Sequence, residues 1–456
     1  MSQRDTPAER SRNCDMASQS PRLPPSGHAP EGRTTGTTPS HPLHPADATI
    51  DIRGEVTLLD PPTCIWRLRA GYSANEPSLE THPGGCEFQP WRLHKVGLLK
   101  FVAWSPNAPG PTSSRTARMT KLICIVGVTG NQGGSVAQRF LRDPNYRVRG
   151  ITRDPYSTSA QALSAQGVEV VAADLDDAQT LIPAFAGANL VFSVTNYWEP
   201  FFRPDCRARA QEIGVGCRRY AYDVEVRQGR NIADAVMSTA DSLDENGFIA
   251  STLSHAGTCS GGKFEELYHF DAKADVFPGY LDEKYPGLAG KTSYVHTGYF
   301  MSSYKLLPAA YLGKQADGTF QMSLPTTPDA SVPHLAVNAD MGNFVYAVSQ
   351  MPPGKKYMAA GSECSWSEFI RLWSRQTGVP AKYKQVSIEE FSALAPDEAF
   401  GAEAGDMFAY SSDPGYDGGD RTLLKAEDIR KAGIECPMTS LEEYMKKEDW
   451  SAILGQ

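Results

Sequence analysis

The glycine-rich segment at 127–133 constrains the fold of this chain more than any other part of its sequence. It reads Gly-Val-Thr-Gly-Asn-Gln-Gly and stands between an apolar strand pattern at 121–126 and a helical pattern at 135–142, with a second strand pattern at 146–152. A strand, a glycine turn, a helix and a second strand in this order form the unit that holds dinucleotide phosphates at a helix N-terminus. The segment therefore predicts a dinucleotide-binding loop and a helix that begins near Gly134.

The three glycines of this loop are expected to have separate roles. Gly127 allows the tight turn, Gly130 lets the backbone approach a pyrophosphate, and Gly133 permits close packing of the helix on the strand. The helix N-terminus then directs its free N–H groups and its dipole at the phosphates. The predicted cofactor-binding residues of the loop are Gly127, Thr129, Gly130, Asn131, Gln132 and Gly133.

Strand-like and helical patterns alternate along the chain after the loop. Further short apolar runs stand at 168–172, 188–194, 248–253 and 291–295. This alternation predicts βαβ units and therefore an α/β fold with a doubly wound parallel sheet, the Rossmann class. We expect this domain at 119–290, and the remaining strands with a smaller, mixed α/β C-terminal domain at 291–456.

Some segments depart from the alternation. Residues 203–220 are basic without clear periodicity, so a surface insertion and a gene-model artefact such as an unspliced intron both stay open. A long helix is predicted from about 223 to 245, and a polar stretch extends to Gly419. Near the C-terminus, Ser440 and Glu443 have the spacing of a capping box that starts a helix.

Residues 1–118 have a different composition from the rest of the chain. They hold 16 of the 33 prolines of the 456 residues, and runs such as 106–111 cannot continue a helix or a central strand. Strand-like patterns occur at 56–59 and 96–104. We expect a mostly disordered tail, which is either a genuine flexible extension or upstream sequence ahead of a natural start at Met119.

Charge and composition restrict the partners and the compartment. Of the formal net charge of −9, none comes from 1–118, where 13 Lys and Arg face 11 Asp and Glu. An acidic body disfavours direct binding to nucleic acid, and no apolar run approaches the roughly 20 residues of a membrane helix. Nine cysteines without CxxC spacing indicate reduced thiols and no metal site. We expect a cytoplasmic protein, with the nucleus as the alternative.

The residues after the second and fourth strands bear on the choice of cofactor. Arg153 stands where an NAD enzyme offers an acidic residue, and a guanidinium there can hold a 2′-phosphate. NADP is therefore predicted. NAD stays possible because Asp154 can reach the ribose, and the two residues can also be a solvated pair at a strand end. Thr195, Asn196 and Tyr197 follow the fourth strand, where the cofactor crosses the sheet edge.

Several motifs resemble those of NmrA-like proteins, which are atypical short-chain dehydrogenases, and of fungal members in particular. The GxxGxxG spacing is typical of extended and atypical dehydrogenases of this kind. The resembling segments within 119–456 are 127–136, 269–273, 296–301, 340–345 and 447–451. The resemblance implies that Asp174 and Leu175, after the third strand, lie beside the adenine. At 203–220 this sequence departs from the family pattern.

Two residues on one helical pattern decide between two functions. Ordinary short-chain dehydrogenases place Tyr and Lys four residues apart on one helix face, where this chain has His269 and Lys273. In the catalytic interpretation, Lys273 binds the nicotinamide ribose and His269 or Lys273 moves the proton. Resemblance to reductases of the isoflavone-reductase type, which work with Lys and no Tyr, supports it. The substrate would be a small secondary-metabolite carbonyl or enone compound.

In the second interpretation, loss of Tyr means loss of chemistry. Resemblance to NmrA itself then implies a redox-sensing negative regulator that binds a transcription factor. The partner is accordingly a small-molecule substrate or a protein. Side chains near the expected site are Ser251 and Ser254 after the fifth strand, and the aromatic Tyr197, Trp198, Tyr299 and Phe300, which wall a substrate pocket or belong to the core.

Overall fold

The computed structural model describes residues 56–60, 64–68, 120–306 and 308–455. Two compact units divide the chain, Met1–Ala108 and Pro109–Gln456. In the first unit, β1 (Val56–Asp60) pairs antiparallel with β2 (Cys64–Leu68), and β1 confirms the strand expected at 56–59. The strand expected at 96–104 and the expected disorder of the tail lie outside the described residues.

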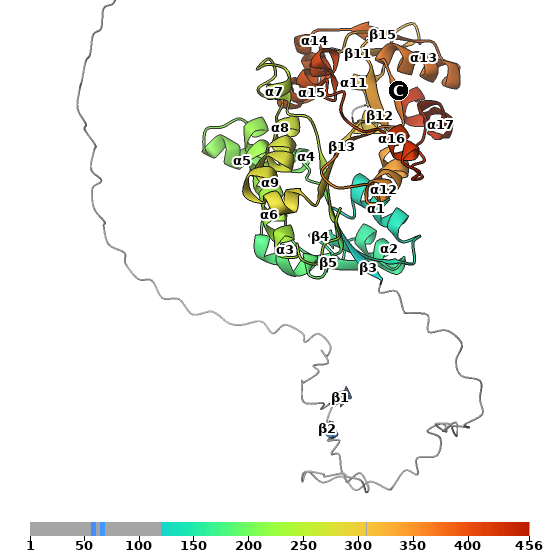
Figure 1. Cartoon of the computed structure of the whole chain (residues 1–456). Helices are drawn as coiled ribbons and strands as arrows, with labels where there is room; N and C mark the ends of the chain where they lie inside the picture. The colour runs from blue at the N-terminus through green and yellow to red at the C-terminus, as the bar shows by residue number, and fades with distance from the viewer. Residues whose placement is uncertain (1–55, 61–63, 69–119, 307, 456) are drawn as a thin grey trace, which may run out of the picture. The chain divides into compact units, whose positions relative to one another are not determined.

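A seven-stranded parallel sheet organises the second unit (Figure 1). Its order is β13-β8-β7-β6-β3-β4-β5, so the strand order reverses between β3 and β6, and the predicted doubly wound Rossmann sheet is confirmed. The strands are β3 (Lys121–Val126), β4 (Tyr146–Thr152), β5 (Glu169–Ala172), β6 (Leu190–Ser193), β7 (Phe248–Thr252), β8 (Thr292–Thr297) and β13 (Lys356–Ala359).

Helices cover both faces of this sheet because successive strand residues point to opposite sides. Ile123 and Ile125 of β3 pack with one helix layer, whereas Leu122, Cys124 and Val126 pack with the other. The first layer contains α1 (Asn131–Phe140), α2 (Thr158–Ala165) and α12 (Val337–Val348). The second layer contains α3 (Ala178–Phe185) and α6 (Cys217–Met237), and Figure 1 shows the two layers on either side of the sheet.

Helix α12 comes from the C-terminal half of the chain but packs directly on α1. The N–H of Gly342 donates to Ser135 Oγ at 2.9 Å, across 207 positions of sequence. A Cβ at Gly342 would lie only 2.2 Å from the Ser135 carbonyl oxygen, so the two helix backbones are in close contact. The helix that carries the glycine loop is therefore held in place by a distant segment.

The predicted smaller, mixed C-terminal part is also present. It contains two three-stranded sheets, each with one parallel and one antiparallel pairing. The first is β10 (Gly313–Lys314), β11 (Phe320–Leu324) and β15 (Ala381–Gln385), and the second is β14 (Ser362–Cys364), β12 (Val332–Leu335) and β9 (Tyr299–Phe300). Its helices include α11 (Pro308–Tyr311), α13 (Trp366–Thr377), α14 (Ile388–Leu394), α15 (Glu398–Tyr410), α16 (Ala426–Lys431), α17 (Leu441–Lys447) and α18 (Ser451–Leu454). The expected capping box of Ser440 and Glu443 starts α17.

Shorter helices connect β6, β7 and β8. They are α4 (Trp198–Phe202), α5 (Pro204–Glu212), α7 (Ala256–Cys259), α8 (Tyr268–Ala274), α9 (Leu281–Lys284) and α10 (Pro286–Ala289). Most of the basic segment at 203–220 is thus helical, in α5 and the first turn of α6. Cys206 and Ala210 of α5 are buried, so this segment is packed into the fold.

Three predicted boundaries were wrong. Helix α1 begins at Asn131 and not near Gly134, because Gly130 already serves as its N-cap. Helix α6 begins six residues before the expected position near 223 and ends at Met237, where the chain turns toward β7. The stretch before Gly419 that was expected to be polar contains α14 and α15, and Glu403 of α15 is fully buried in an ion pair with Arg218.

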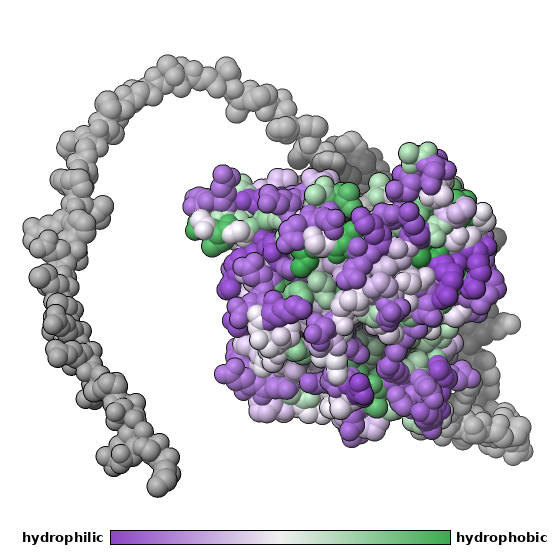
Figure 2. Space-filling model, turned by 90° about the horizontal axis from the view of Figure 1, so that it is seen from above, coloured by the Kyte–Doolittle hydropathy of each residue, from purple (hydrophilic) through white to green (hydrophobic). Residues whose placement is uncertain are grey.

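The surface of the described part of the chain is mainly hydrophilic in the view of Figure 2, with hydrophobic residues in scattered positions. The exposed large hydrophobic side chains include Tyr156, Phe202, Leu306 and Leu394. Among the described residues, no helix is long and apolar enough to cross a membrane.

Candidate functional site

The glycine loop joins β3 to α1 with little space for side chains. Gly127 has a φ of +64°, and the N–H of Gly130 donates to its carbonyl at 2.9 Å, which closes the turn. A Cβ at Gly133 would lie 2.3 Å from the Gly127 carbonyl oxygen, so only glycine permits this packing. Because the first N–H groups of a helix lack intrahelical acceptors and the first turn of α1 contains no acidic residue, the loop can receive an anion.

A side-chain contact ties the residues of the glycine loop to β7. Ser251, near the end of β7, donates its hydroxyl hydrogen to Gln132 Oε1 at 2.8 Å. Ser254 instead lies 2.9 Å from the hydroxyl of Tyr410 on α15. The two serines considered from the sequence therefore have different surroundings, and only Ser251 contacts the glycine loop.

Arg153 lies just after β4 and forms an ion pair with Glu199 of α4. Its Nη1 is 2.7 Å from Glu199 Oε1, and the same oxygen is 3.6 Å from Arg203 Nη1. Asp154 makes a local contact instead, in which its Oδ1 accepts a hydrogen bond from the N–H of Tyr156 at 2.8 Å. Arg153 and Asp154 are therefore not paired with each other in this structure.

The other expected cofactor contacts lie at the carboxyl ends of β5 and β6. Asp174 and Leu175 follow β5, and the N–H of Asp174 donates to Thr180 Oγ1 at 2.9 Å. After β6, Thr195 is buried, whereas Asn196 is exposed and accepts the N–H of Trp198 at 3.2 Å. The side chain of Tyr197 is fully buried, and its hydroxyl donates to the Arg218 carbonyl at 3.1 Å.

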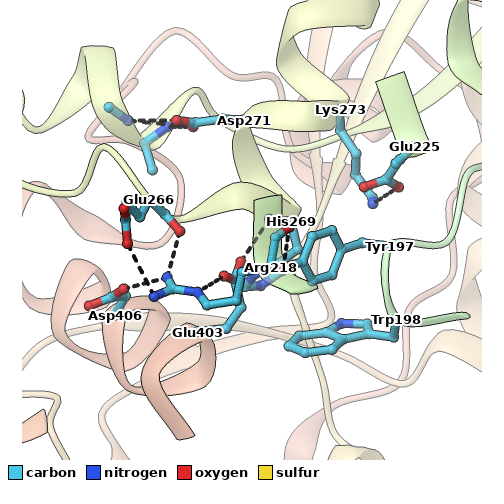
Figure 3. A network of polar contacts seen from close by, with 12 residues as sticks. Tyr197, Trp198, Arg218, Glu225, Glu266, His269, Asp271, Lys273, Glu403 and Asp406 are labelled. Carbon is cyan, nitrogen blue, oxygen red and sulfur yellow. Dashed lines mark hydrogen bonds and ion pairs between the residues drawn. The ribbon is translucent and has the colours of Figure 1, made fainter. Parts of the chain in front are cut away.

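Lys273 of α8 is paired with a carboxylate inside the protein (Figure 3). Its Nζ contacts Glu225 Oε1 on α6, and the two side chains are only 12% and 1% exposed. The second oxygen, Glu225 Oε2, is buried without a hydrogen-bond partner in the structure. A buried ion pair of this kind positions the ammonium group and leaves one carboxylate oxygen unsatisfied.

His269, one turn before Lys273 on α8, is held by a second carboxylate. Its Nδ1 is 2.7 Å from Glu403 Oε1 on α15, so the imidazole donates from Nδ1 and its Nε2 is left for other contacts. Burial alone would raise the pKa of Glu403, but the hydrogen bond from His269 and the charge of Arg218 hold that pKa below its usual value. The rings of Tyr197 and Trp198 pack against the imidazole.

Arg218 connects this pair to the Asp406 carboxylate and to the backbone carbonyl of Glu266, as Figure 3 shows. It lies 2.7 Å from Glu403 Oε2 and 2.7 Å from Asp406 Oδ2, and it donates to the Glu266 carbonyl at 2.6 Å. The network joins α6, α8 and α15, which are far apart in sequence. His269 therefore lies at the end of a buried chain of charges.

Four partners of the predicted site residues could not be found from the sequence. Glu225, Glu403 and Arg218 stand among the charged residues of longer helices, and Glu199 stands in the short aromatic helix α4. Only the fold brings Glu403 next to His269 from 134 positions away. Of the four, only Glu225 has a local sequence feature that could have drawn attention to it. It is a charged residue between Val224 and Val226, on the buried side of α6.

The sheet order and the glycine loop define the class of this protein. It is a doubly wound Rossmann protein whose strand order reverses between β3 and β6, the point at whose carboxyl edge proteins of this class bind their ligands. The model of the NmrA-like family matches residues 119–448. The chain therefore belongs to the NmrA-like family, as the motifs in its sequence predict.

Relatives and solved structures agree with this assignment. The NmrA-like family domain-containing oxidoreductase FrzB of a Cladobotryum species is 44% identical over 277 residues, which cover 59% of this chain and 77% of FrzB. The structure of NmrA, a negative transcriptional regulator, in complex with NADP has a TM-score of 0.55 and 19% identity, covering 72% of this chain and 95% of NmrA. The NADPH-dependent quinone oxidoreductase QOR2 of Escherichia coli, complexed with NADPH, has a TM-score of 0.51 and 21% identity, covering 71% and 98%. These two structures share the fold.

Proposed function

We propose that this chain is an NADP(H)-dependent reductase of small conjugated carbonyl or enone compounds. The observation that carries the proposal is the arrangement on α8, where Lys273 and His269, one helical turn apart, each have a buried carboxylate partner. Curated relatives such as FrzB are named oxidoreductases, and the fold is shared with QOR2, whose name gives NADPH and quinones. These names support the reaction class.

The residues of the site fit a dinucleotide. The glycines let the loop pack tightly, because a Cβ at Gly133 would meet the Gly127 carbonyl oxygen at 2.3 Å, and the first turn of α1 would offer its N–H groups to the pyrophosphate. We assign phosphate binding to this loop with Thr129, Asn131 and Gln132, the 2′-phosphate to Arg153, and the adenine to Asp174 and Leu175. Thr195 and Asn196 would border the nicotinamide side, with Tyr197 as the buried ring behind them.

The bound cofactor would supply a hydride to the substrate, and the residues of α8 would manage the proton. Lys273 is oriented by Glu225 and would donate to the nicotinamide ribose. His269 is oriented through Nδ1 by Glu403, so a protonated Nε2 would deliver a proton to the reduced substrate. Glu403 is a positioning residue in this proposal, because it engages Nδ1 and leaves Nε2 as the nitrogen that would transfer the proton.

Oxidation of NADPH by the full chain tests this proposal, with a panel of quinones and enones such as menadione. Lys273→Met leaves Glu225 without its cation, so the charge-neutral double variant Lys273→Met/Glu225→Gln is the safer test of chemistry. We expect this double variant to bind NADPH more weakly and to lose turnover. We expect His269→Gln to keep NADPH binding and to lower turnover at least tenfold. Turnover that survives in both would contradict the roles given to α8.

A second candidate function is favoured by one observation. Both Lys273 and the Nδ1 of His269 already have partners inside the protein, as in ion pairs that only support a fold. A dinucleotide-sensing regulator that binds a transcription factor would need Lys273 and His269 only for such structural ion pairs. If the cofactor-loaded chain reduces no compound of the panel while NADP and NADPH change its affinity for a protein partner, this second function replaces the first.

A further inference from the structure

We propose that Glu199 sets the cofactor preference of this protein by competing with the 2′-phosphate of NADP for Arg153. The inference rests on the proposed function, in which Arg153 holds that phosphate. Nothing in the sequence around Glu199 marks it as part of the site, because it stands in an aromatic helix on the other side of the strand-order reversal. Its role follows from where the fold places its carboxylate.

The ion pair spans the place where a dinucleotide would enter. Arg153 follows β4 and Glu199 belongs to α4, which follows β6, while β3 lies between these two strands in the sheet. The carboxyl ends of parallel strands meet at one edge of a sheet, so the 2.7 Å contact between Arg153 Nη1 and Glu199 Oε1 crosses the carboxyl end of β3. The glycine loop begins at that same end, at Gly127.

Glu199 keeps a second cationic neighbour, Arg203, when Arg153 moves from its carboxylate to a cofactor phosphate. The same Oε1 lies 3.6 Å from Nη1 of Arg203, and Nε of Arg203 contacts Asp205 Oδ1 at 2.9 Å. The side chains of Arg153 and Glu199 are 54% and 28% exposed, so water reaches the pair and keeps it weak. Arg153 can therefore exchange Glu199 for another anion while Arg203 keeps the carboxylate neutralised.

The exchange separates the two cofactors. A 2′-phosphate carries more charge than a carboxylate and can accept two guanidinium hydrogen bonds, so it can take Arg153 from Glu199. The 2′-hydroxyl of NAD carries no charge, so NAD would bind with the Arg153–Glu199 pair intact. Glu199 therefore lowers the affinity for NADP and leaves the affinity for NAD unchanged. The ratio of NADP affinity to NAD affinity is then smaller than it would be with Arg153 alone.

Calorimetric titration of the full chain with NADP⁺, NAD⁺, 2′,5′-ADP and 5′-AMP tests the inference. In Glu199→Gln, NADP⁺ and 2′,5′-ADP should bind roughly two- to fivefold more tightly, the range that an exposed ion pair supplies, while NAD⁺ and 5′-AMP stay unchanged. Asp205→Asn is the matched control, because it removes an equal charge that contacts Arg203 and not Arg153. In Arg153→Ala, a second substitution of Glu199 should have no effect on any of the four ligands.

The outcomes separate this inference from the proposed function. An unchanged ratio of NADP⁺ to NAD⁺ affinity in Glu199→Gln would overturn the inference alone. An equal gain for both cofactors would also overturn it, because Glu199 would then obstruct the crevice for any dinucleotide. A wild-type chain that binds neither cofactor would overturn the proposed function and this inference with it.

Discussion

Gly133 tolerates no side chain in this structure. A Cβ there would lie 2.3 Å from the Gly127 carbonyl oxygen and 2.9 Å from Val128 Cα, and both neighbours are backbone atoms that cannot turn aside. Either α1 moves away from β3 or the turn opens, and both changes displace the N–H groups that would face a phosphate. The requirement therefore applies to the fold and to the candidate site together.

We expect Gly133→Ala to lower the affinity for NADP⁺ at least tenfold and to destabilise the chain by about 1–3 kcal/mol, the usual cost of overpacking. Isothermal titration and urea unfolding measure the two effects. Gly287→Ala is the control, because a Cβ at that position meets no atom within 4 Å. If Gly133→Ala bound NADP⁺ as tightly as the control, the loop would not be the phosphate site.

At the scale of elements, the sequence predicts the sheet well and the long-range contacts poorly. The strands β3, β4 and β5 appear within one residue of their predicted ends, because each is a short run with apolar residues that is bounded by turns. Helix α15 could not be predicted, because its charged residues make the sequence look like a solvent-exposed stretch. In the structure, ion pairs allow its charged face to be buried. The same reason hides Glu403, whereas His269 and Lys273 are visible from their spacing alone.

The Arg218 network predicts how strongly α15 depends on its ion pairs. In Arg218→Leu, the fully buried Glu403 and the partly buried Asp406 lose their shared cation, which should cost about 3–5 kcal/mol. The exposed pair of Arg209 with Glu212 is the matched control, and Arg209→Leu should leave the free energy of unfolding nearly unchanged. Urea unfolding of both variants checks this, and equal losses would mean that the network adds little to stability.

Asp271, on α8, gives the contact between α7 and α8 a pH dependence. Burial raises the pKa of Asp271 to about 6 from an ordinary 3.8, although His255 and the N–H groups of Gly257 and Ala256 oppose the rise. The folded state therefore holds this proton more tightly than the unfolded state between these two pH values. The stabilisation is complete below pH 3.8 and is lost as the pH rises through about 6.

We expect Asp271→Asn to remove this loss, because the amide oxygen can still accept the N–H of Ala256 and carries no charge. Relative to wild type, the variant should therefore gain in Tm when the pH is raised from 4.5 to 7. The difference between the two proteins is the quantity to measure, since His255 has a raised pKa, through its hydrogen bond with Asp275, and titrates in the same direction in wild type. A constant difference across this pH range would contradict the assignment.

At the scale of the whole molecule, the second unit contains three large clusters of buried hydrophobic residues among those that the structure describes. The three described clusters of buried residues draw all their members from between Leu122 and Ile453. We therefore expect a chain that begins at Met119 to fold and to bind NADP⁺ with an affinity within twofold of the full chain. Calorimetry and thermal unfolding of the two proteins check this. Insolubility of the shorter chain, or loss of binding, would mean that residues before 119 complete the domain.

The packing of α12 on α1 has a consequence for the order in which the protein becomes functional. Gly342 is synthesised 207 residues after Ser135, the residue that its N–H contacts. At 5–20 residues per second, a ribosome needs about 10–40 s to cover that distance. Throughout this interval the apolar face of α1 has no α12 to cover it, and the glycine loop is anchored on one side only. Nascent chains that end before α12 should therefore recruit chaperones and retain no dinucleotide, so the first motif to be translated is among the last to become functional.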